Sequence, residues 1–317
     1  MQGPESLKPG WGHTELGRRP PFSTPPPLSI VTGAPAPRSE VSEIAIMAFS
    51  IVFIRHGESL NNTIYDRVRG LLGNDVSEEL LDAEERKLRS PDPGLTEKGL
   101  EQANRLGEHI RSNDFSFGKV FPSGAQSWKV FTSPMLRALQ TTQAAFIDVK
   151  AKVLPFLYES GGFYGGQYGS KGSSNAESVE AAFPGFSCDE GMEHGWYNLD
   201  HEESPSEFLQ RAQLVSEWIL ARRENVIIVS HGNLMSAVIN RLCTNGNSPA
   251  GCLNVHCNTG WTHLVMHPQK NTKLLPVVVG VNRFDHLLHL PHLQTGARPE
   301  DDHWIPEFLP LFAVELR

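Results

Sequence analysis

The apolar pattern is clearest in two short runs that lie far apart in the chain, Ile51–Ile54 and Val226–Val229. Continuous apolar runs of this length are typical of strands that are buried on both faces of a parallel sheet. Each run leads into a motif that contains His-Gly, namely Arg55-His56-Gly57 and Ser230-His231-Gly232. Open α/β sheets bind ligands just beyond the carboxyl ends of their strands. The sequence therefore predicts a functional site where these two strands end.

Apolar residues at helical spacing predict helices that cover this sheet. One helix has Thr96 as its N-cap and a core-facing stripe formed by Leu100, Ala103, Gly107 and Ile110. Another begins with a capping box that has Pro at its first position, Ser204-Pro205-Ser206-Glu207. Its stripe consists of Phe208, Ala212, Val215 and Ile219, and the helix after His231 continues through Leu234, Val238 and Leu242.

Further strands complete the predicted sheet. Val130–Thr132 predicts a strand, and we expect the next helix to have Ser133 as its N-cap and Pro134 as its first residue. Lys152–Leu157 predicts another strand, and Trp261–Met266 with Leu274–Val281 predicts a closing pair. These elements indicate an α/β fold with three layers, α/β/α, around a mostly parallel central sheet.

Two stretches depart from this regular pattern. Tyr65–Arg89 is rich in charge, and we expect most of it to be a solvated insertion. Gly161–Gly169 alternates glycines with aromatic residues, which favours a mobile loop whose aromatics form a wall for a substrate. A flexible linker with scattered aromatics is the alternative interpretation of that loop.

Residue composition divides the chain into three parts. Residues 1–46 are rich in Pro, Gly and Ser without apolar periodicity, so they predict a disordered leader. Organelle targeting by this leader is an alternative, although its glutamates do not fit a transit peptide. Residues 47–290 form the predicted catalytic domain, which starts at Met47, and 291–317 form a C-terminal extension of unknown role.

Charge and cysteine content narrow the classes of partner. The net charge of −8 argues against nucleic acid and anionic membrane surfaces as partners, and no apolar run is long enough to span a membrane. Few cysteines and no secretory signal favour a reducing, cytoplasmic location. We expect no metal or other cofactor, because neither candidate set has a known ligand pattern: Cys243, Cys252, His256 and Cys257, or His286, His289 and His292.

Several short motifs, in this order, resemble the histidine phosphatase superfamily, branch 1, which includes cofactor-dependent phosphoglycerate mutases and fructose-2,6-bisphosphatases. They cover roughly the middle two thirds of the chain, and no single motif is specific. The matching residues are Arg55-His56-Gly57-Glu58-Ser59, Asn62, Asp92–Gly99, Gln102-Ala103, Thr132-Ser133-Pro134, Arg137-Ala138, Thr141, Leu157-Tyr158-Glu159 and Ser230-His231-Gly232-Asn233.

The resemblance and the chemistry of phosphoryl transfer assign roles to five residues. His56 is the expected nucleophile, which attacks phosphorus and carries a phosphohistidine. Arg55 and Arg137 offer the forked donors that match a phosphate, and their charge disfavours an imidazolium at His56. The resemblance implies that Glu159 is the acid that protonates the leaving group. His231, if protonated, adds another donor.

Five further residues are candidates for binding phosphate or substrate. Asn62 can donate from its amide, and backbone N–H groups near Gly57 and Gly232 can line an anion site. The resemblance suggests Arg67 as an additional phosphate ligand, with Arg69 as an alternative. Tyr164 is the candidate from the aromatic wall. Competitors for the role of acid remain open: Glu177, Glu190 and Glu193.

The function predicted from these residues is hydrolysis of a small phosphorylated substrate by a metal-independent phosphatase. One alternative is phosphoglycerate mutase-type phosphoryl transfer. The resemblance weakens it, because the mutase branch has Glu-Arg-His-Tyr-Gly at the acid, whereas Glu159 here precedes Ser160-Gly161-Gly162. A second alternative is an inactive module that only binds a phosphorylated ligand. The sequence leaves the substrate and the oligomeric state open.

Overall fold

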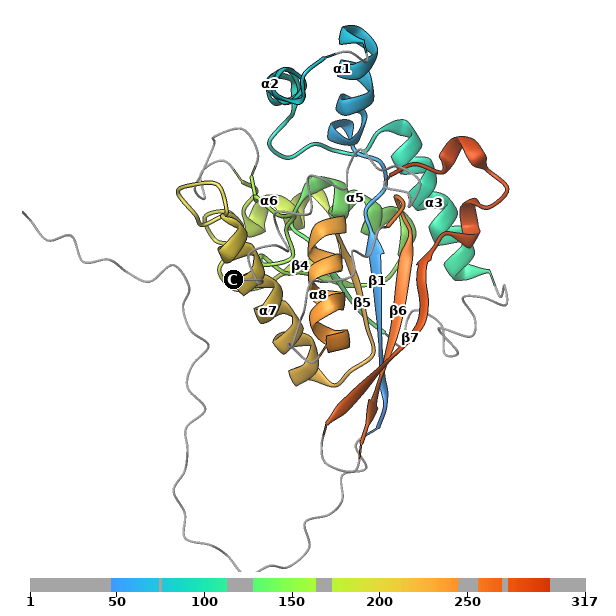
Figure 1. Cartoon of the computed structure of the whole chain (residues 1–317). Helices are drawn as coiled ribbons and strands as arrows, with labels where there is room; N and C mark the ends of the chain where they lie inside the picture. Colours follow the sequence, from blue (N-terminus) through green and yellow to red (C-terminus); the bar gives the residue numbers. More distant parts are fainter. Residues whose placement is uncertain are drawn as a thin grey trace, which may run out of the picture. The chain divides into compact units, whose positions relative to one another are not determined.

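The structure is a computed structural model that describes residues 47–73, 76–112, 128–163, 173–244, 256–269 and 273–296. The predicted leader, Tyr164 and most of the predicted C-terminal extension lie outside these residues. The central sheet has the strand order β4-β3-β2-β5-β1-β6-β7 (Figure 1). Its strands are β1 (Phe49–Arg55), β2 (Lys129–Thr132), β3 (Ala151–Val153), β4 (Phe186–Cys188), β5 (Val226–Ser230), β6 (Trp261–Pro268) and β7 (Leu274–Arg283).

Strands β4, β3, β2, β5 and β1 run parallel, and β6 and β7 close the sheet as an antiparallel pair. The expectation of a mostly parallel sheet with a closing pair is thus confirmed. The apolar runs Ile51–Ile54 and Val226–Val229 are paired directly, with Ile51 opposite Val226 and Arg55 opposite Ser230. Their carboxyl ends therefore bring the two His-Gly motifs to one place.

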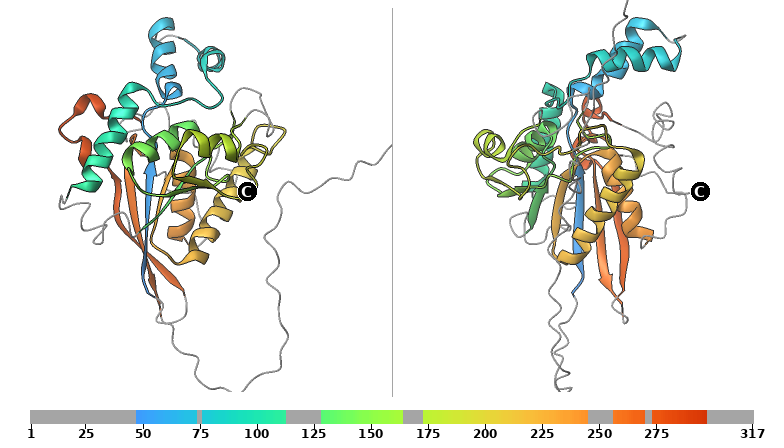
Figure 2. Two further views of the ribbon diagram at one scale, coloured as in Figure 1. Left: turned by 180° about the vertical axis from the view of Figure 1, so that it is seen from behind. Right: turned by 90° about the vertical axis from the view of Figure 1, so that its left-hand side faces the viewer.

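Helices cover both faces of the sheet, as the three-layer prediction requires. Views from behind and from the side show α3 and α5 on one face and α7 and α8 on the other (Figure 2). The helices are α1 (Ile64–Leu72), α2 (Glu78–Leu88), α3 (Glu97–Arg111), α5 (Leu136–Ala145), α6 (Ala176–Ala182), α7 (Pro205–Arg222) and α8 (Gly232–Thr244), with short 3₁₀ turns η1 (Leu60–Thr63), η4 (Asp285–Leu287) and η5 (Pro291–Leu293).

The alternation of side chains along β1 divides the core into two halves. Val52 and Ile54 pack in the cluster that includes Leu106 of α3 and Leu139 of α5. Ile51 and Phe53 pack in the opposite cluster, with α7 and α8. Burying one such side chain fully contributes about 1.5–3 kcal/mol, so this strand is anchored firmly from both sides.

Two predicted details of the helices are wrong. Leu100 of the predicted stripe is 47% exposed, whereas Ala103 and Leu106 are fully buried. The buried face of α3 differs from the predicted stripe because the first turn of the helix packs on the loop after β1, where Gly99 lies against the backbone of Glu58. Helix α5 begins at Leu136, with Met135 as its N-cap residue, and not at Pro134 with Ser133 as the N-cap.

The charged insertion folds into two helices, α1 and α2, at the carboxyl end of β1 (Figure 1). Its own small core consists of Ile64, Val68 and Leu81. The expectation of a solvated segment holds for its surface, since four of its leucines are more than 40% exposed: Leu71, Leu72, Leu80 and Leu88. The side chain of Asn61 ties η1 to the end of the insertion by two bonds with the backbone of Ser90.

Candidate active site

His56 follows the last residue of β1, and its ring is held in one tautomer. Its Nδ1 lies 2.6 Å from the carbonyl oxygen of Gly57. A carbonyl only accepts hydrogen bonds, so Nδ1 carries the proton and Nε2 presents a lone pair. The Nε–H of Arg137 lies 3.2 Å from this Nε2. The nitrogen that could act as a nucleophile therefore faces a guanidinium group.

Backbone contacts fix the position of His56 from several elements. Its N–H donates to the carbonyl of Ser230 at 3.0 Å, and its carbonyl accepts from the side chain of Asn258 at 3.1 Å. The N–H of Gly57 donates to the hydroxyl of Thr141 at 2.9 Å. A Cβ on Gly57 would lie 2.5 Å from the carbonyl oxygen of Gly99. Gly57 is thus required for the close approach of α3, and its N–H is already engaged.

Arg55 and Arg137 place two positive charges beside His56. Arg137 lies in the first turn of α5 and is buried. Arg55 donates from Nη1 to the carbonyl of His256 at 2.5 Å, while its buried Nε has no partner among the described residues. An unpaired guanidinium N–H beside the candidate nucleophile can serve an anionic ligand.

The electrostatic environment keeps His56 neutral. Burial lowers the pKa of His56 well below its usual value, and the charges of Arg137 and Arg55 lower it further. Burial lowers the pKa of His231 well below its usual value too, with further contributions from Arg137 and His56. Without an anion in the site, both imidazoles are therefore unprotonated at neutral pH.

His231 follows β5, and its ring centroid is 5.0 Å from that of His56. Its Nε2 is 2.7 Å from the hydroxyl of Ser133, and its Nδ1 is buried without a partner among the described residues. Ser133 is not the N-cap of α5, but its hydroxyl still accepts from the N–H of Met135 at 3.2 Å while it binds His231. A residue far away in the sequence also caps the first turn of α5, since the N–H of Leu136 donates to the Asp92 carboxylate at 2.9 Å.

Asp92 also contributes to the electrostatics of the site. Burial raises its pKa to about 6, although the charge of Arg137 and the bond from Leu136 act in the opposite direction. Burial lowers the pKa of Arg137, and the charge of Asp92 opposes this shift. Asp92 therefore links the cap of α5 to the cation that faces His56.

Glu159 lies in the irregular segment after β3, and its carboxylate faces the amino end of α8. It accepts from the N–H of Ser160 at 2.9 Å and, at longer range, from those of Asn233 and Leu234 at 3.4 and 3.3 Å. Burial lowers the pKa of both Arg55 and Arg137, and the charge of Glu159 opposes this shift in each. The carboxylate is therefore electrostatically coupled to the two cations around His56.

The other predicted site residues are less tightly grouped. Gly232 begins α8, and its Cβ position would be 3.7 Å from Nε of Arg55. The side-chain oxygen of Asn62 accepts from the N–H and hydroxyl of Ser59, which leaves its amide nitrogen to donate. Arg67 is exposed on α1, and no contact between described residues joins it to His56.

The competing carboxylates are not brought to this group. Glu177, Glu190 and Glu193 are exposed, and the side chain of Glu193 accepts from the N–H of Gly191. Among the described residues, no cluster of three or more His, Cys, Asp or Glu side chains could hold a metal ion. The described part of the chain also contains no helix that is both long and apolar enough to cross a membrane.

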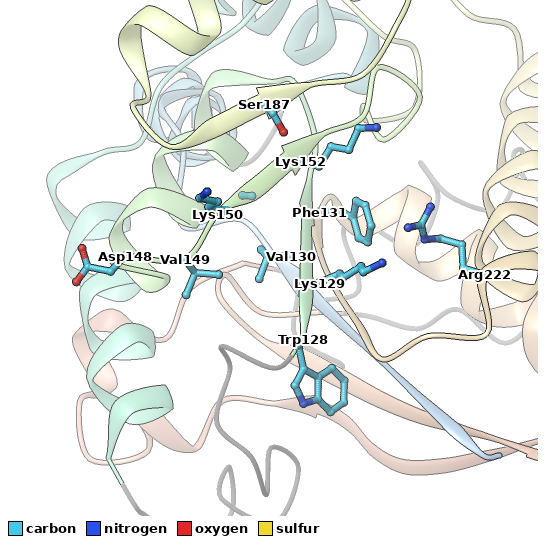
Figure 3. Close-up of a pocket in the computed structure, with 11 residues that line it drawn as sticks. Trp128, Lys129, Val130, Phe131, Asp148, Val149, Lys150, Lys152, Ser187 and Arg222 are labelled. Carbon is cyan, nitrogen blue, oxygen red and sulfur yellow. The ribbon is translucent and has the colours of Figure 1, made fainter.

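A cavity of about 640 Å³ lies away from this group, at the amino ends of β2 and β3 (Figure 3). Three lysines and an arginine line it, and three of these cations are already paired with acidic residues: Lys129 and Arg222 with Glu224, and Lys152 with Asp189. None of the residues proposed for chemistry lines it.

Sequence reasoning did not find all the residues that shape the site. Thr141, Ser133 and Asp92 belong to motifs that were noted, but their partners come from other elements. Arg211 carried a signal that was overlooked, since a charged residue follows Phe208 at helical spacing on the apolar face of α7. It is 2% exposed and forms a buried ion pair with Glu203.

Comparison with solved structures finds likeness at low identity. A proposed alpha-ribazole-5'-P phosphatase from Escherichia coli is 18% identical, with a TM-score of 0.44, over 75% of this chain and 98% of that one. A phosphoserine phosphatase from Entamoeba histolytica, in complex with 3-phosphoglyceric acid, is 21% identical, with a TM-score of 0.39, over 76% and 100%. A mycobacterial glucosyl-3-phosphoglycerate phosphatase is 18% identical, with a TM-score of 0.41, over 74% and 99%.

No match was found among curated proteins. A family model does match, and it is described as the histidine phosphatase superfamily (branch 1). The match covers residues 51–277, which is well over half of the chain and includes most of β1, all of β5 and every residue placed around His56 above. The chain therefore belongs to branch 1 of the histidine phosphatase superfamily.

Proposed function

We propose that this protein is a metal-independent phosphatase that hydrolyses a small phosphomonoester through a phosphohistidine on His56. The observation that carries the proposal is the state of His56. Its Nδ1–H is committed to the carbonyl of Gly57, its Nε2 lone pair faces Arg137 at 3.2 Å, and its pKa is well below the usual value. A neutral imidazole with an oriented lone pair is ready for nucleophilic attack at neutral pH.

The first step transfers the phosphoryl group. Nε2 of His56 forms a bond to phosphorus as the ester P–O bond breaks, and the leaving oxygen takes a proton from Glu159. Arg137 and Arg55 stabilise the charge on the phosphoryl oxygens, and both lie beside His56 before substrate binds. Donors that are already oriented need little reorganisation during the reaction.

The second step releases phosphate. Water attacks phosphorus, Glu159 accepts its proton, and the P–N bond to His56 breaks, which restores the free enzyme. The negative charge of a bound phosphate opposes the depression of the pKa of His231 by its neighbours, so His231 can then bind a proton and donate to the phosphate. Asn62 and Gly232 remain proposed phosphate ligands at the edge of this group.

The substrate is a small phosphorylated molecule whose identity stays open. The solved proteins that the chain resembles are described with phosphoserine, ribazole phosphate and glucosyl-3-phosphoglycerate, and these are reasonable first compounds to test. A cytoplasmic location stays a prediction from the cysteine content.

An activity panel in the presence of EDTA tests the proposal. It uses p-nitrophenyl phosphate, phosphoserine, sugar phosphates and 3-phosphoglycerate, with His56→Ala as the control. We expect phosphate release that EDTA does not affect and that His56→Ala abolishes. Isomerisation of 3-phosphoglycerate without net release would establish the mutase alternative. Phosphate binding without turnover of any compound would favour a binding module.

A further inference from the structure

A buried ion pair lies directly behind the segment that carries Glu159. Arg211 of α7 and Glu203, just before the N-cap of that helix, have side chains that are 2% and 1% exposed. The guanidinium binds the carboxylate with both arms of its fork, Nε to Oε1 at 2.6 Å and Nη2 to Oε2 at 2.6 Å. The hydroxyl of Tyr158 also donates to Glu203 at 3.2 Å.

Every N–H of this guanidinium has a partner. Besides the two bonds to Glu203, Nη1 donates to the carbonyls of Phe156 and Tyr158 at 3.1 and 2.7 Å. The last N–H, on Nη2, points to the carbonyl of Glu159 at 3.4 Å. An arginine has five donors in a rigid plane. Three of them bind backbone carbonyls of the segment that ends in the proposed acid.

This segment contains no regular secondary structure, and its other contacts are single bonds from neighbouring elements, such as that from the Ser230 hydroxyl to the carbonyl of Leu157 at 2.9 Å. Strand β3 ends at Val153, and no helix or strand includes the residues between it and Gly162. The guanidinium also stacks on the ring of Tyr158, 3.7 Å from its centroid. Arg211 therefore connects a long, well-anchored helix to the short backbone stretch that aims the Glu159 carboxylate.

The chemistry of a buried ion pair suggests a purpose beyond stability. Removing two charges from water costs several kcal/mol for each ion, and apolar replacements of such pairs are often as stable. The geometry points to positioning instead: we propose that Arg211, held by Glu203, fixes the backbone of Glu159 so that its carboxylate meets the leaving-group oxygen. The proposal rests on the function proposed above and goes beyond it, because neither residue touches the substrate.

The test compares leaving groups, since only a poor leaving group needs the acid. Arg211→Lys keeps the charge but lacks the planar fork. We expect its kcat on an alkyl phosphate to fall by about ten- to a hundredfold, because small misplacements of a catalytic group cost rates of this order. On p-nitrophenyl phosphate, we expect kcat to stay within about threefold of wild type, since that leaving group departs unprotonated.

A second variant separates positioning from folding. Arg211→Met combined with Glu203→Gln removes both buried charges and keeps an acceptor for the Tyr158 hydroxyl. It should fold and show the same selective loss on alkyl phosphates. Arg222→Lys is the matched control, because Arg222 lies eleven residues along the same helix and pairs with Glu224. The control should leave both activities unchanged.

Three results would overturn the inference. The first is an equal loss on both substrates in Arg211→Lys, and the second is a folded double variant with wild-type selectivity for leaving groups. Glu159→Gln is measured in parallel. If it shows the selective loss, either of these two results refutes the role of Arg211 and leaves Glu159 as the proposed acid. The third is Glu159→Gln without any dependence on the leaving group, which would refute the proposed acid together with the residue proposed to position it.

Discussion

Replacing Gly57 by Ala tests whether close packing around the first motif positions the nucleophile. Gly57 adjoins His56, and its carbonyl accepts the Nδ1–H of that residue at 2.6 Å. A Cβ at this position would be 2.5 Å from the carbonyl oxygen of Gly99, at the first turn of α3. Both sides of this contact are backbone, so no flexible side chain can move away.

The size of the effect follows from the distance. Ordinary contacts begin at 3.4 Å, so the loop and the helix must separate by up to 0.9 Å, the difference between the two values. Overpacking of this kind costs about 1–3 kcal/mol of stability. A shift of about 1 Å at the nucleophile can lower the rate about a hundredfold. We therefore expect Gly57→Ala to lose activity out of proportion to its loss of folded protein.

The measurement is kcat/KM for p-nitrophenyl phosphate, together with urea unfolding of the same preparation. Gly70→Ala is the control, because that glycine lies in α1 with no atom within 4 Å of its Cβ position. It should gain about 0.5–1 kcal/mol from helix propensity and keep its activity. A Gly57→Ala enzyme with wild-type stability and kcat/KM would refute the reasoning.

Three other perturbations test the electrostatics. Glu159→Gln should reduce kcat for alkyl phosphates far more than for p-nitrophenyl phosphate, and equal losses would exclude it as the acid. Arg137→Ala should lose about 3–4 kcal/mol of transition-state stabilisation, as for an oxyanion donor, and an unchanged kcat/KM would remove it from the site. Urea unfolding at about pH 7 and pH 5 tests the buried histidines. His56 and His231 have folded pKa values below the unfolded value of 6.5, so their contribution to stability is present above pH 6.5 and is lost as the pH falls below it. The expected slope is about 1.4 kcal/mol per histidine per pH unit. Asp92, with its pKa raised to about 6, opposes this loss, because its carboxylate binds a proton at a higher pH in the folded state than in the unfolded state. A free energy of unfolding that is equal or higher at pH 5 would contradict the burial of the histidines.

The parts of the fold that local chemistry determines could be predicted from the sequence. The apolar run Ile51–Ile54 has no polar residue to place in solvent, which favours a central strand, and β1 is one. The capping box at Ser204 gives α7 its start by bonds within four residues, and the structure has the same reciprocal pair with Glu207.

The parts that depend on distant partners could not be predicted. Ser133 has the chemistry of an N-cap, yet its hydroxyl binds a histidine 98 residues away. The two helices of the insertion pack mainly on each other, so they bury few apolar residues. The charged sequence there therefore resembles a loop. Arg211 is a charge on an apolar face that the sequence analysis overlooked, and only the fold shows that three of its donors bind the segment of Glu159.

The most direct test of the proposed mechanism is to trap the phosphorylated enzyme. Wild-type protein would be mixed rapidly with a substrate that is turned over and quenched in alkali, where phosphohistidine survives, and the modified peptide would be located by mass spectrometry. The mechanism predicts one phosphoryl group on His56 that is lost on acid treatment and absent from His56→Ala. A phosphoryl group on another residue, or full turnover by His56→Ala, would contradict it.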